Sequence, residues 1–290
     1  MRRLTTVLTS LTVAAALLSG CSPEQGSAPE VVVTGEPGQV PVLEYEAPLT
    51  VGEARAEVVW EGEGPSVADG QPILVDYYAE AGADASLVGE TFTSDPRPYL
   101  LSAEALGVDI YRALSGRTVG SRILHLAPPS DGQSSSTVAV FDLLPTRAAG
   151  EPVEPRDGLP TVELAENGEP TVTIPEGEPP SELVVQPLIK ATGPQVEPMQ
   201  VITVQFTGVR WSDGTVFDSS WDPGKLPAPF PIGVGSVIAG WDEGLVEQTV
   251  GSQVLLIIPP SLGYGGTDQE LATETLVFVV DILAANGRNS

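Results

Sequence analysis

The sequence predicts an α+β protein built from two tandem domains, each an antiparallel β-sheet wrapped on one short α-helix. Three observations support this prediction. Segments from the two halves of the chain match at a nearly constant spacing, which indicates an internal repeat. Runs such as VITVQF and VLLII are short and rich in β-branched residues, which is typical of strands. Helical patterns are brief, so we expect each sheet of about five or six strands to carry one short helix.

The N-terminus predicts export. Arg2 and Arg3 precede an apolar run (LTVAAALLSG) and then Cys21, the only cysteine. Residues 1–20 are therefore expected to be a signal peptide, which is too short to span a membrane as a helix. The stretch from Leu18 to Cys21 resembles a bacterial lipobox, which implies cleavage before Cys21 and a diacylglyceryl group on its sulfur. The alternative is an ordinary signal peptide with an incidental cysteine. A lipidated chain would be anchored at the extracytoplasmic face of the cell membrane.

Two segments of low hydrophobicity divide the rest of the chain. Residues 21–40 are small, polar and proline-bearing, and are expected to form a flexible tether. Residues 148–158 lie in a second such stretch (TRAAGEPVEPRDG) and are expected to form a linker. The predicted domains are therefore 41–147 and 159–290.

The two domains match segment by segment. Gly64-Pro65, which QPILVDYY follows, corresponds to Gly193-Pro194, which MQVITVQF follows, at an offset of 129 between the two Gly-Pro pairs. VGSRILHLAPPS corresponds to VGSQVLLIIPPS at an offset of 131, and each domain ends on an apolar run, TVAVFDLL or TLVFVVDIL. Two similar domains explain the chain length better than one large fold.

In the second domain TVTI and ELVV add two strands before Gly193. The helical candidate is residues 242–247, with apolar positions 241, 245 and 246 on one side. Trp241 is expected to point at the sheet, and Gly240 is expected to let the chain turn into the helix.

Charge and composition exclude several classes of function. The formal net charge is −26, so binding to the phosphates of a nucleic acid is not expected, and the acids are interpreted as a solvated surface. No acidic run has the spacing of a calcium loop, and the glycines at 233, 235 and 240 lack the strand–helix context of a nucleotide loop. The only histidine, His125, lies in the first domain, so Ser/His/Asp catalysis is not expected in the second. We predict no cofactor and no metal.

Residues 200–283 resemble the FKBP-type peptidyl-prolyl cis-trans isomerases, the tacrolimus-binding family. Three elements occur in the family's order: DG followed by FDSS, VI followed by GWDEGL, and IPP followed by YG. The resemblance implies an FKBP-like fold, with the first domain a degenerate copy. It also implies binding of proline-containing exported polypeptides and of tacrolimus-like macrolides.

The resemblance also assigns site residues. Phe206, where the family often has Tyr, is expected to form an apolar wall, Trp241 the floor on which a proline ring rests, and Phe230 to pack nearby rather than to contact the ligand. Ile238 would donate its backbone N–H, Tyr264 its hydroxyl, and Asp218 would orient hydroxyl groups. The implied catalytic residues are Asp218, Ile238 and Tyr264, and the implied substrate-binding residues are Phe206, Phe217, Val237, Trp241 and Phe278. Without the family spacing, the same aromatic residues would be interpreted as ordinary core.

Two features depart from the family pattern. Ala228 stands where an aromatic residue is common, and the loop after Tyr264 (GGTDQELATET) is short, with Leu271 as the candidate to complete the rim. The intact set of Asp218, Ile238, Trp241 and Tyr264 favours a membrane-anchored isomerase acting on exported proteins, whereas the altered loop favours the alternative. The alternative is a lipoprotein whose FKBP-like domains bind peptides, as a chaperone would, without catalysis.

In the first domain we align Tyr77 with Phe206, Phe92 with Phe217, Thr93 with Asp218 and Ile110 with Trp241. No tyrosine follows LAPPS, so this domain is expected to be inactive, a spacer or a surface that holds substrate.

Overall fold

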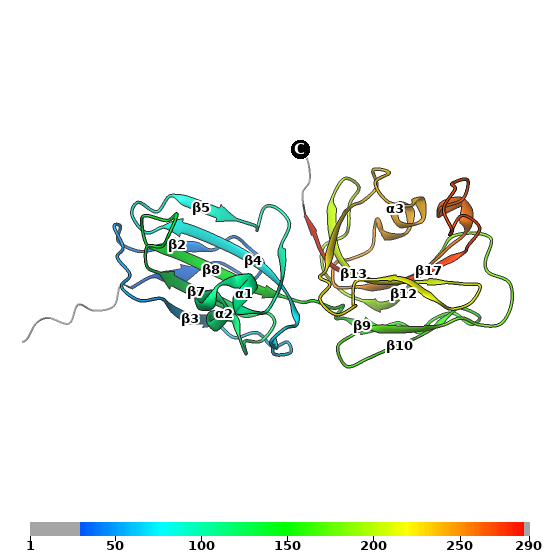
Figure 1. Ribbon diagram of the computed structural model, residues 1–290, viewed down its shortest axis with the longest axis horizontal. Coiled ribbons are helices and arrows are strands. Elements are labelled where there is room, and N and C mark those ends of the chain that lie inside the picture. The colour runs from blue at the N-terminus through cyan, green and yellow to red at the C-terminus, as the bar shows by residue number, and fades with distance from the viewer. Residues whose placement is uncertain (1–29, 287–290) are drawn as a thin grey trace, which may run out of the picture.

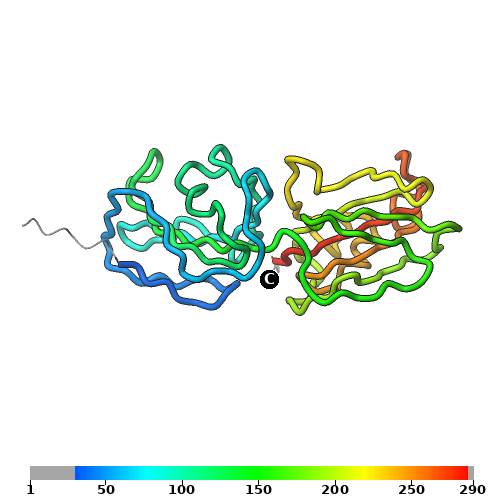
Figure 2. Tube along the Cα trace, turned by 90° about the horizontal axis from the view of Figure 1, so that it is seen from below, coloured from blue at the N-terminus to red at the C-terminus, as the bar shows by residue number. Residues whose placement is uncertain are grey.

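The computed structural model describes residues 30–286. Figures 1 and 2 show two β-rich domains side by side, joined by the segment that follows β8. Cys21, the signal peptide and the lipidation site lie outside the described residues. Among the residues that are described, no helix is long and apolar enough to cross a membrane.

The first domain contains a six-stranded antiparallel sheet in the order β3-β7-β8-β4-β5, with β6 also paired to β4. Its strands and helices are β3 (Arg55–Trp60), β4 (Pro72–Ala81), β5 (Leu87–Glu90), β6 (Arg97–Leu100), α1 (Ala103–Leu106), α2 (Val108–Leu114), β7 (Arg122–Ala127) and β8 (Thr137–Leu144).

The second domain repeats this topology. Its seven-stranded sheet has the order β14-β13-β17-β16-β12-β9, with β15 paired to β13. Read from the opposite end, β12-β16-β17-β13-β14 matches β3-β7-β8-β4-β5, and α3 takes the place of α2. The elements are β9 (Glu151–Pro152), β12 (Val184–Lys190), β13 (Val201–Arg210), β14 (Val216–Ser219), β15 (Ala228–Pro231), α3 (Ala239–Leu245), β16 (Gln253–Ile258), the 3₁₀ turn η1 (Pro260–Leu262) and β17 (Leu276–Asn286).

Each sheet is covered on both faces, because its strands alternate their side chains. In the first domain Ile123 packs with the residues of α2, whereas Leu124 packs on the other face with Val33 and Leu43. Those two residues belong to the hairpin of β1 (Val32–Thr34) and β2 (Val42–Glu44). A second hairpin, β10 (Thr161–Leu164) and β11 (Pro170–Thr173), covers the outer face of the second sheet in the same way.

Both predicted connecting segments contain paired strands. The expected tether 21–40 is wrong for residues 32–34, because Val33 pairs with Leu43 and packs on the sheet. The expected linker 148–158 is wrong for Glu151 and Pro152, which form β9 beside β12.

Helix α3 begins earlier than predicted, at Ala239, and ends at Leu245 rather than at residue 247. Glu247 has a φ of 70°, which ends helical geometry. The expected role of Gly240 is also wrong, because this residue lies inside the helix. A Cβ on Gly240 would lie 2.5 Å from Ile258 Cγ2, and one on Gly244 would lie 2.7 Å from Leu256 Cδ2. The two glycines therefore let α3 approach β16 closely.

Candidate active site

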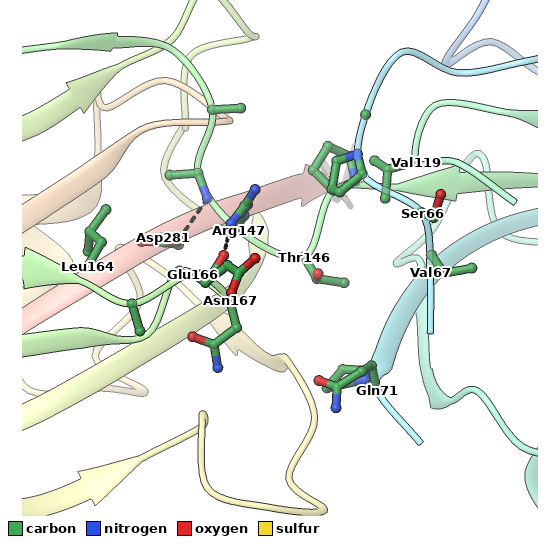
Figure 3. A pocket seen from close by; sticks show the side chains of 18 of the residues that line it. Ser66, Val67, Gln71, Val119, Thr146, Arg147, Leu164, Glu166, Asn167 and Asp281 are labelled. Atoms are coloured by element: carbon green, nitrogen blue, oxygen red, sulfur yellow. Dashed lines mark hydrogen bonds between the residues drawn. The ribbon is translucent and has the colours of Figure 1, made fainter. Parts of the chain in front are cut away.

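The second domain has a cavity of about 520 Å³ between its sheet and α3. All eight residues that the sequence predicted for the site line it: Phe206, Phe217, Asp218, Val237, Ile238, Trp241, Tyr264 and Phe278. Phe230 lines it as well, so the expectation that this ring only packs nearby is wrong. A larger cavity of about 680 Å³ lies where the two domains meet, and it contains none of the predicted site residues (Figure 3).

Trp241 is the centre of the aromatic lining. The centroid of its ring lies 5.5 Å from the ring centroid of Phe206, 5.1 Å from that of Phe230 and 5.3 Å from that of Phe278. Each pair is close to an edge-to-face arrangement. Such contacts stabilise by about 0.5–1.5 kcal/mol beyond the area that they bury. The Trp241 side chain is 4 % exposed and still lines the cavity, so it belongs to both core and site.

The indole N–H of Trp241 is buried and forms no hydrogen bond within the described chain. An unpaired buried donor costs about 1–3 kcal/mol, and most core positions avoid it. The tryptophan therefore costs more stability here than a phenylalanine or a leucine would, which is typical of a residue kept for a site.

Gly208 is a site feature that the sequence analysis missed. It lies in β13 two residues after Phe206, so both residues face the same side of the sheet. A Cβ at this position would lie 2.7 Å from Phe217 Cζ and 2.8 Å from Phe278 Cε1. Glycine thus makes room for two rings of the lining. A lone glycine inside a β-branched strand is the signal that could have revealed this close approach.

Gly208→Ala is expected to lower kcat/KM for Xaa–Pro isomerisation about tenfold, because the added methyl group displaces the rings of Phe217 and Phe278. The measurement is an isomerisation assay on a proline peptide. The repeat places Ala79 of the first domain at the same position, and this alanine is buried without difficulty. Ala79→Gly is the control and should leave activity unchanged. Wild-type activity in Gly208→Ala would contradict the role assigned to Gly208.

Asp242 holds the loop at the rim of the cavity. Its carboxylate accepts hydrogen bonds from the backbone N–H groups of Gly233 and Gly235, each at 2.7 Å. Both glycines have positive φ, 71° and 74°, which other residues rarely adopt. Because this loop leads directly into Val237 and Ile238, Asp242 sets the position of the cavity wall.

Asp242→Ala is expected to lower kcat/KM about three- to tenfold, because two hydrogen bonds to a charged acceptor are lost and the rim loosens. We expect the peptide KM to rise more than kcat falls, as NMR titration combined with exchange rates can determine. Glu243→Ala is the matched control, since Glu243 is the exposed neighbouring acid. An equal effect of both variants would show that only the charge of the helix matters.

Ile238 and Tyr264 contribute polar groups to the cavity. Ile238 is the N-cap residue of α3, and its carbonyl accepts the N–H of Trp241 at 2.9 Å. Its own N–H precedes the helical hydrogen bonds and is not used in them. Tyr264 follows η1 and is half-buried. Leu271 packs against the core cluster and is not part of the lining, so it does not complete the rim as expected.

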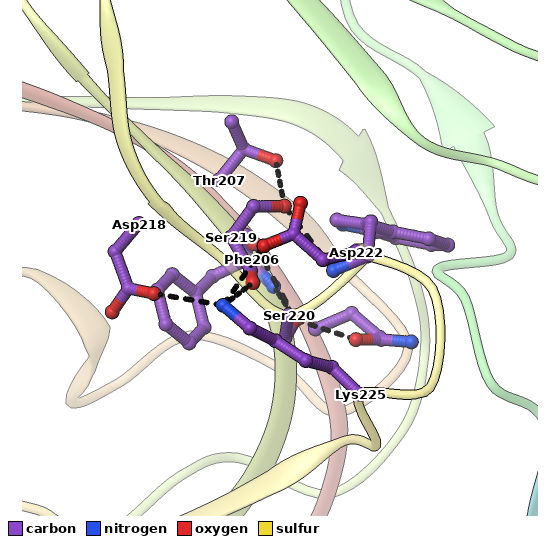
Figure 4. Close-up of polar contacts among 9 residues, drawn as sticks. Phe206, Thr207, Asp218, Ser219, Ser220, Asp222 and Lys225 are labelled. Atoms are coloured by element: carbon purple, nitrogen blue, oxygen red, sulfur yellow. Dashed lines mark hydrogen bonds and ion pairs between the residues drawn. The ribbon is translucent and has the colours of Figure 1, made fainter.

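Asp218 is the carboxylate of the lining, with a side chain that is 53 % exposed. It forms an ion pair with Lys225, with Oδ1 and Nζ 3.4 Å apart (Figure 4). Phe206 carries no hydroxyl that Asp218 could orient, and the charged partner of Asp218 is Lys225.

The first domain lacks these groups, although not in the alignment expected from the sequence. The N–H of Phe206 donates to Ser220 Oγ, and the N–H of Tyr77 donates to Thr91 Oγ1 in the same manner. The offset of 129 therefore continues through the next strand. It places Gly89, not Thr93, at the Asp218 position, and Val88, not Phe92, at the Phe217 position.

Two further observations complete the comparison with the first domain. The ring of Phe92 lies 5.7 Å from the guanidinium carbon of Arg122, outside any counterpart of the cavity. Ile110 is the third residue of α2, as Trp241 is of α3, which confirms that part of the alignment.

Comparison with known proteins identifies the second domain. The model of the FKBP-type peptidyl-prolyl cis-trans isomerase family matches residues 193–283. An FK506-binding protein of Streptomyces anulatus is 40 % identical over 119 residues, which are 40 % of this chain and 95 % of that protein. The chain belongs to the FKBP-type peptidyl-prolyl cis-trans isomerase family.

Two further relatives agree with this family assignment. A probable FK506-binding protein of Corynebacterium glutamicum is 37 % identical over 118 residues, which are 40 % of this chain and 98 % of that protein. An Arabidopsis thaliana protein named peptidyl-prolyl cis-trans isomerase FKBP15-1 is 44 % identical over 92 residues, which are 31 % of this chain and 59 % of that protein. The protein is therefore an isomerase of the FKBP type. The segment matched by the family model contains every predicted residue of the cavity.

Proposed function

We propose that this isomerase catalyses rotation about Xaa–Pro bonds in the cavity of its second domain, and that it does so as a lipid-anchored folding catalyst for exported polypeptides. One observation carries the location of the site. Five aromatic rings, the N-cap of α3 and Tyr264 surround one cavity inside the segment that matches the family.

The chemistry requires no nucleophile. Rotation about the bond breaks amide conjugation, with a barrier of about 18–20 kcal/mol and uncatalysed times of about 10–100 s. The twisted amide is less polar than the planar, hydrated one. A dry aromatic cavity binds the twisted form better, and this difference in binding lowers the barrier.

Each polar group of the cavity has a proposed role. The proline ring rests on Trp241, while the N–H of Ile238 and the hydroxyl of Tyr264 hold the carbonyls on either side of it. Asp218 supplies a fixed negative charge at the rim, where it orients donor groups of the substrate. Tacrolimus-like macrolides are proposed to occupy the same cavity. Their binding should change the Trp241 fluorescence, and this change should be absent in Trp241→Ala.

The location of the site is tested with the full chain in an NMR-exchange assay on Xaa–Pro peptides. We expect catalysis by the wild type, a kcat/KM that is lower by about 10- to 100-fold in Trp241→Ala, and unchanged catalysis in Ile110→Ala, which changes the equivalent position of the first domain. Catalysis that survives in Trp241→Ala but disappears in Ile110→Ala would move the activity to the first domain. An absence of catalysis by the wild type would refute the proposal that the cavity is an active site.

The first domain is proposed to be a non-catalytic spacer or a polypeptide-holding surface. It has Gly89 in place of the carboxylate and Ile110 in place of the tryptophan. Non-catalytic binding of polypeptides, the alternative to isomerisation, is therefore proposed for the first domain and not for the second.

The membrane anchor is proposed from the stretch between Leu18 and Cys21, in which Cys21 would carry the lipid. Cys21→Ser should block incorporation of labelled fatty acid and shift the protein from the membrane fraction to the soluble fraction. Ser22→Ala should leave both unchanged. Membrane association of Cys21→Ser without a lipid label would point to a different anchor.

A further inference from the structure

Lysine is rare in this acidic chain, and one of its two lysines stands beside the cavity. Only Lys190 and Lys225 occur, against 39 acidic residues. Lys190 lies at the end of β12, four strands away from β14 in the sheet order. Lys225 follows β14, the strand that carries Phe217 and Asp218.

A tight turn brings Lys225 back toward Asp218. In the run Asp222-Pro223-Gly224-Lys225 the N–H of Lys225 donates to the carbonyl of Asp222 at 3.0 Å. Proline in the second position and a glycine with a φ of 82° in the third are the signature of a type II turn. The local sequence therefore encodes the position of the lysine.

The ammonium group of Lys225 has an acceptor for each of its three hydrogens. Nζ lies 2.6 Å from the carbonyl oxygen of Ser219, 2.9 Å from Asp222 Oδ2 and 3.4 Å from Asp218 Oδ1 (Figure 4). The hydrogen bond with Asp222 is the main reason why the pKa of Lys225 is raised, so the side chain stays charged. A cation engaged in this way is not available to bind substrate. It acts on the carboxylates around it.

The charge of the rim depends on this contact. Asp218 is half-exposed and lines the cavity, whose lining contains no lysine or arginine. Two unit charges about 4 Å apart near a surface interact strongly enough to change a rate constant several-fold. An unpaired Asp218 would therefore repel a substrate residue of like charge beside the proline.

We propose that Lys225 is a positioning residue that holds the Asp218 carboxylate at the rim and partly offsets its charge, so that the cavity accepts peptides with an acidic residue next to proline. This inference rests on the proposed location of the site. It concerns the choice of substrate, and the isomerisation chemistry is unaffected by it.

The test compares Lys225→Met with the wild type on three peptides that differ only in the residue before proline, which is Glu, Leu or Lys. We expect kcat/KM of Lys225→Met to fall about three- to fivefold more for the Glu peptide than for the Lys peptide. At about 1 M salt, where the screening length is about 3 Å, the difference should disappear. Lys225→Arg should behave as the wild type. Lys190→Met removes the same charge elsewhere and should not discriminate among the peptides.

A second measurement tests whether Asp218 is the intermediary. In an Asp218→Asn background, Lys225→Met should no longer alter the ratio of Glu to Lys peptides. Because the chain has two lysines, the side-chain NMR signal of Lys225 can be followed by itself, and Asp218→Asn should shift it while leaving Lys190 unchanged.

The possible failures are distinguishable. A wild type that is inactive on the Leu peptide refutes the proposed site. An active wild type for which Lys225→Met affects all three peptides equally, or affects none, overturns the inference. The inference is also overturned if Lys225→Met still discriminates among the peptides in the Asp218→Asn background, or if Asp218→Asn does not shift the NMR signal of Lys225.

Discussion

Replacement of Trp241 by alanine is expected to lower kcat/KM for Xaa–Pro isomerisation about 10- to 100-fold. The indole lines the cavity and contacts three phenylalanine rings. Loss of an apolar contact of this size removes about 1.5–3 kcal/mol of binding to the twisted amide, and each 1.4 kcal/mol corresponds to a factor of ten in rate. Trp241→Phe keeps a ring at the floor and should retain part of the activity.

The same change also destabilises the fold, since removing a buried tryptophan side chain costs about 3–5 kcal/mol. Trp211 provides a matched control. It is 8 % exposed in the same domain, but it packs on the opposite face of the sheet among the residues of the β10–β11 hairpin. Trp211→Ala should lose similar stability in urea unfolding while the folded protein keeps its rate. Equal loss of activity in the folded forms of both variants would mean that Trp241 has only a structural role.

The second large effect concerns pH and Asp281. Asp281 lies in β17 and is 2 % exposed, and burial is the main reason why its pKa rises from 3.8 to about 6. It accepts hydrogen bonds from the backbone N–H of Ala148 and from Gln253 Nε2, each at 2.7 Å, and the charge of nearby Arg147 partly offsets the shift. Both donors are neutral, so neither of them forms an ion pair with the ionised carboxylate.

The direction of the effect follows from the raised pKa. Between about pH 4 and pH 6 the folded state keeps the proton of Asp281 while the unfolded state has lost it. The contribution of this group to stability is therefore greatest at low pH and falls by about 3 kcal/mol as the pH rises through 6. Compared with Asp281→Asn, the wild type should lose about this much more stability between pH 3.5 and pH 7, as urea unfolding at a series of pH values would measure. Parallel stability curves for the two proteins would rule out the buried charge as the cause.

The first domain contains the paired counterpart of this residue. Asp142 occupies the equivalent position in β8, where Arg122 donates Nε to Oδ1 at 2.6 Å and Nη2 to Oδ2 at 2.7 Å. Asp142→Asn would leave the charge of Arg122 buried without its partner. It should lower stability by about 3–5 kcal/mol at pH 7, in contrast to the gain expected there from removing the charge of Asp281.

Much of the fold follows from local patterns. The repeat offsets of 129 and 131 place two pairs of strands correctly, because β4 and β13 have ten residues each and β7 and β16 have six each. The eight site residues also converge on one cavity, as the resemblance to the family implied. The misplaced counterparts of Phe217 and Asp218 have a simple cause. Phe92-Thr93 resembles Phe217-Asp218 in the sequence, and the alignment of the two pairs rests on this resemblance. The hydrogen bonds of Thr91 and Ser220 show instead that the offset of 129 continues unchanged into the next strand.

Other features depend on contacts that a linear pattern does not contain. Strand β9 has two residues, and nothing local distinguishes it from the polar segment around it. Strand β1 lies in a run of β-branched residues, but it has only three residues and stands between proline- and glycine-bearing segments. Gly208 is recognisable as a glycine in a strand, but the two rings beside it come from β14 and β17. Phe230 belongs to the lining because β15 pairs with β13, and this pairing is not encoded in its own neighbours.

Strand β9 has a consequence for an enzyme that handles extended polypeptides. An outer strand with unpaired backbone groups can recruit any unfolded chain by β-addition, which leads to aggregation. Glu151 and Pro152 occupy that position along Lys190 and Ile189, and proline has no N–H to offer to a further strand. The segment between the domains therefore covers β12 at Ile189 and Lys190, and a fragment that began at residue 159 would lack this cover.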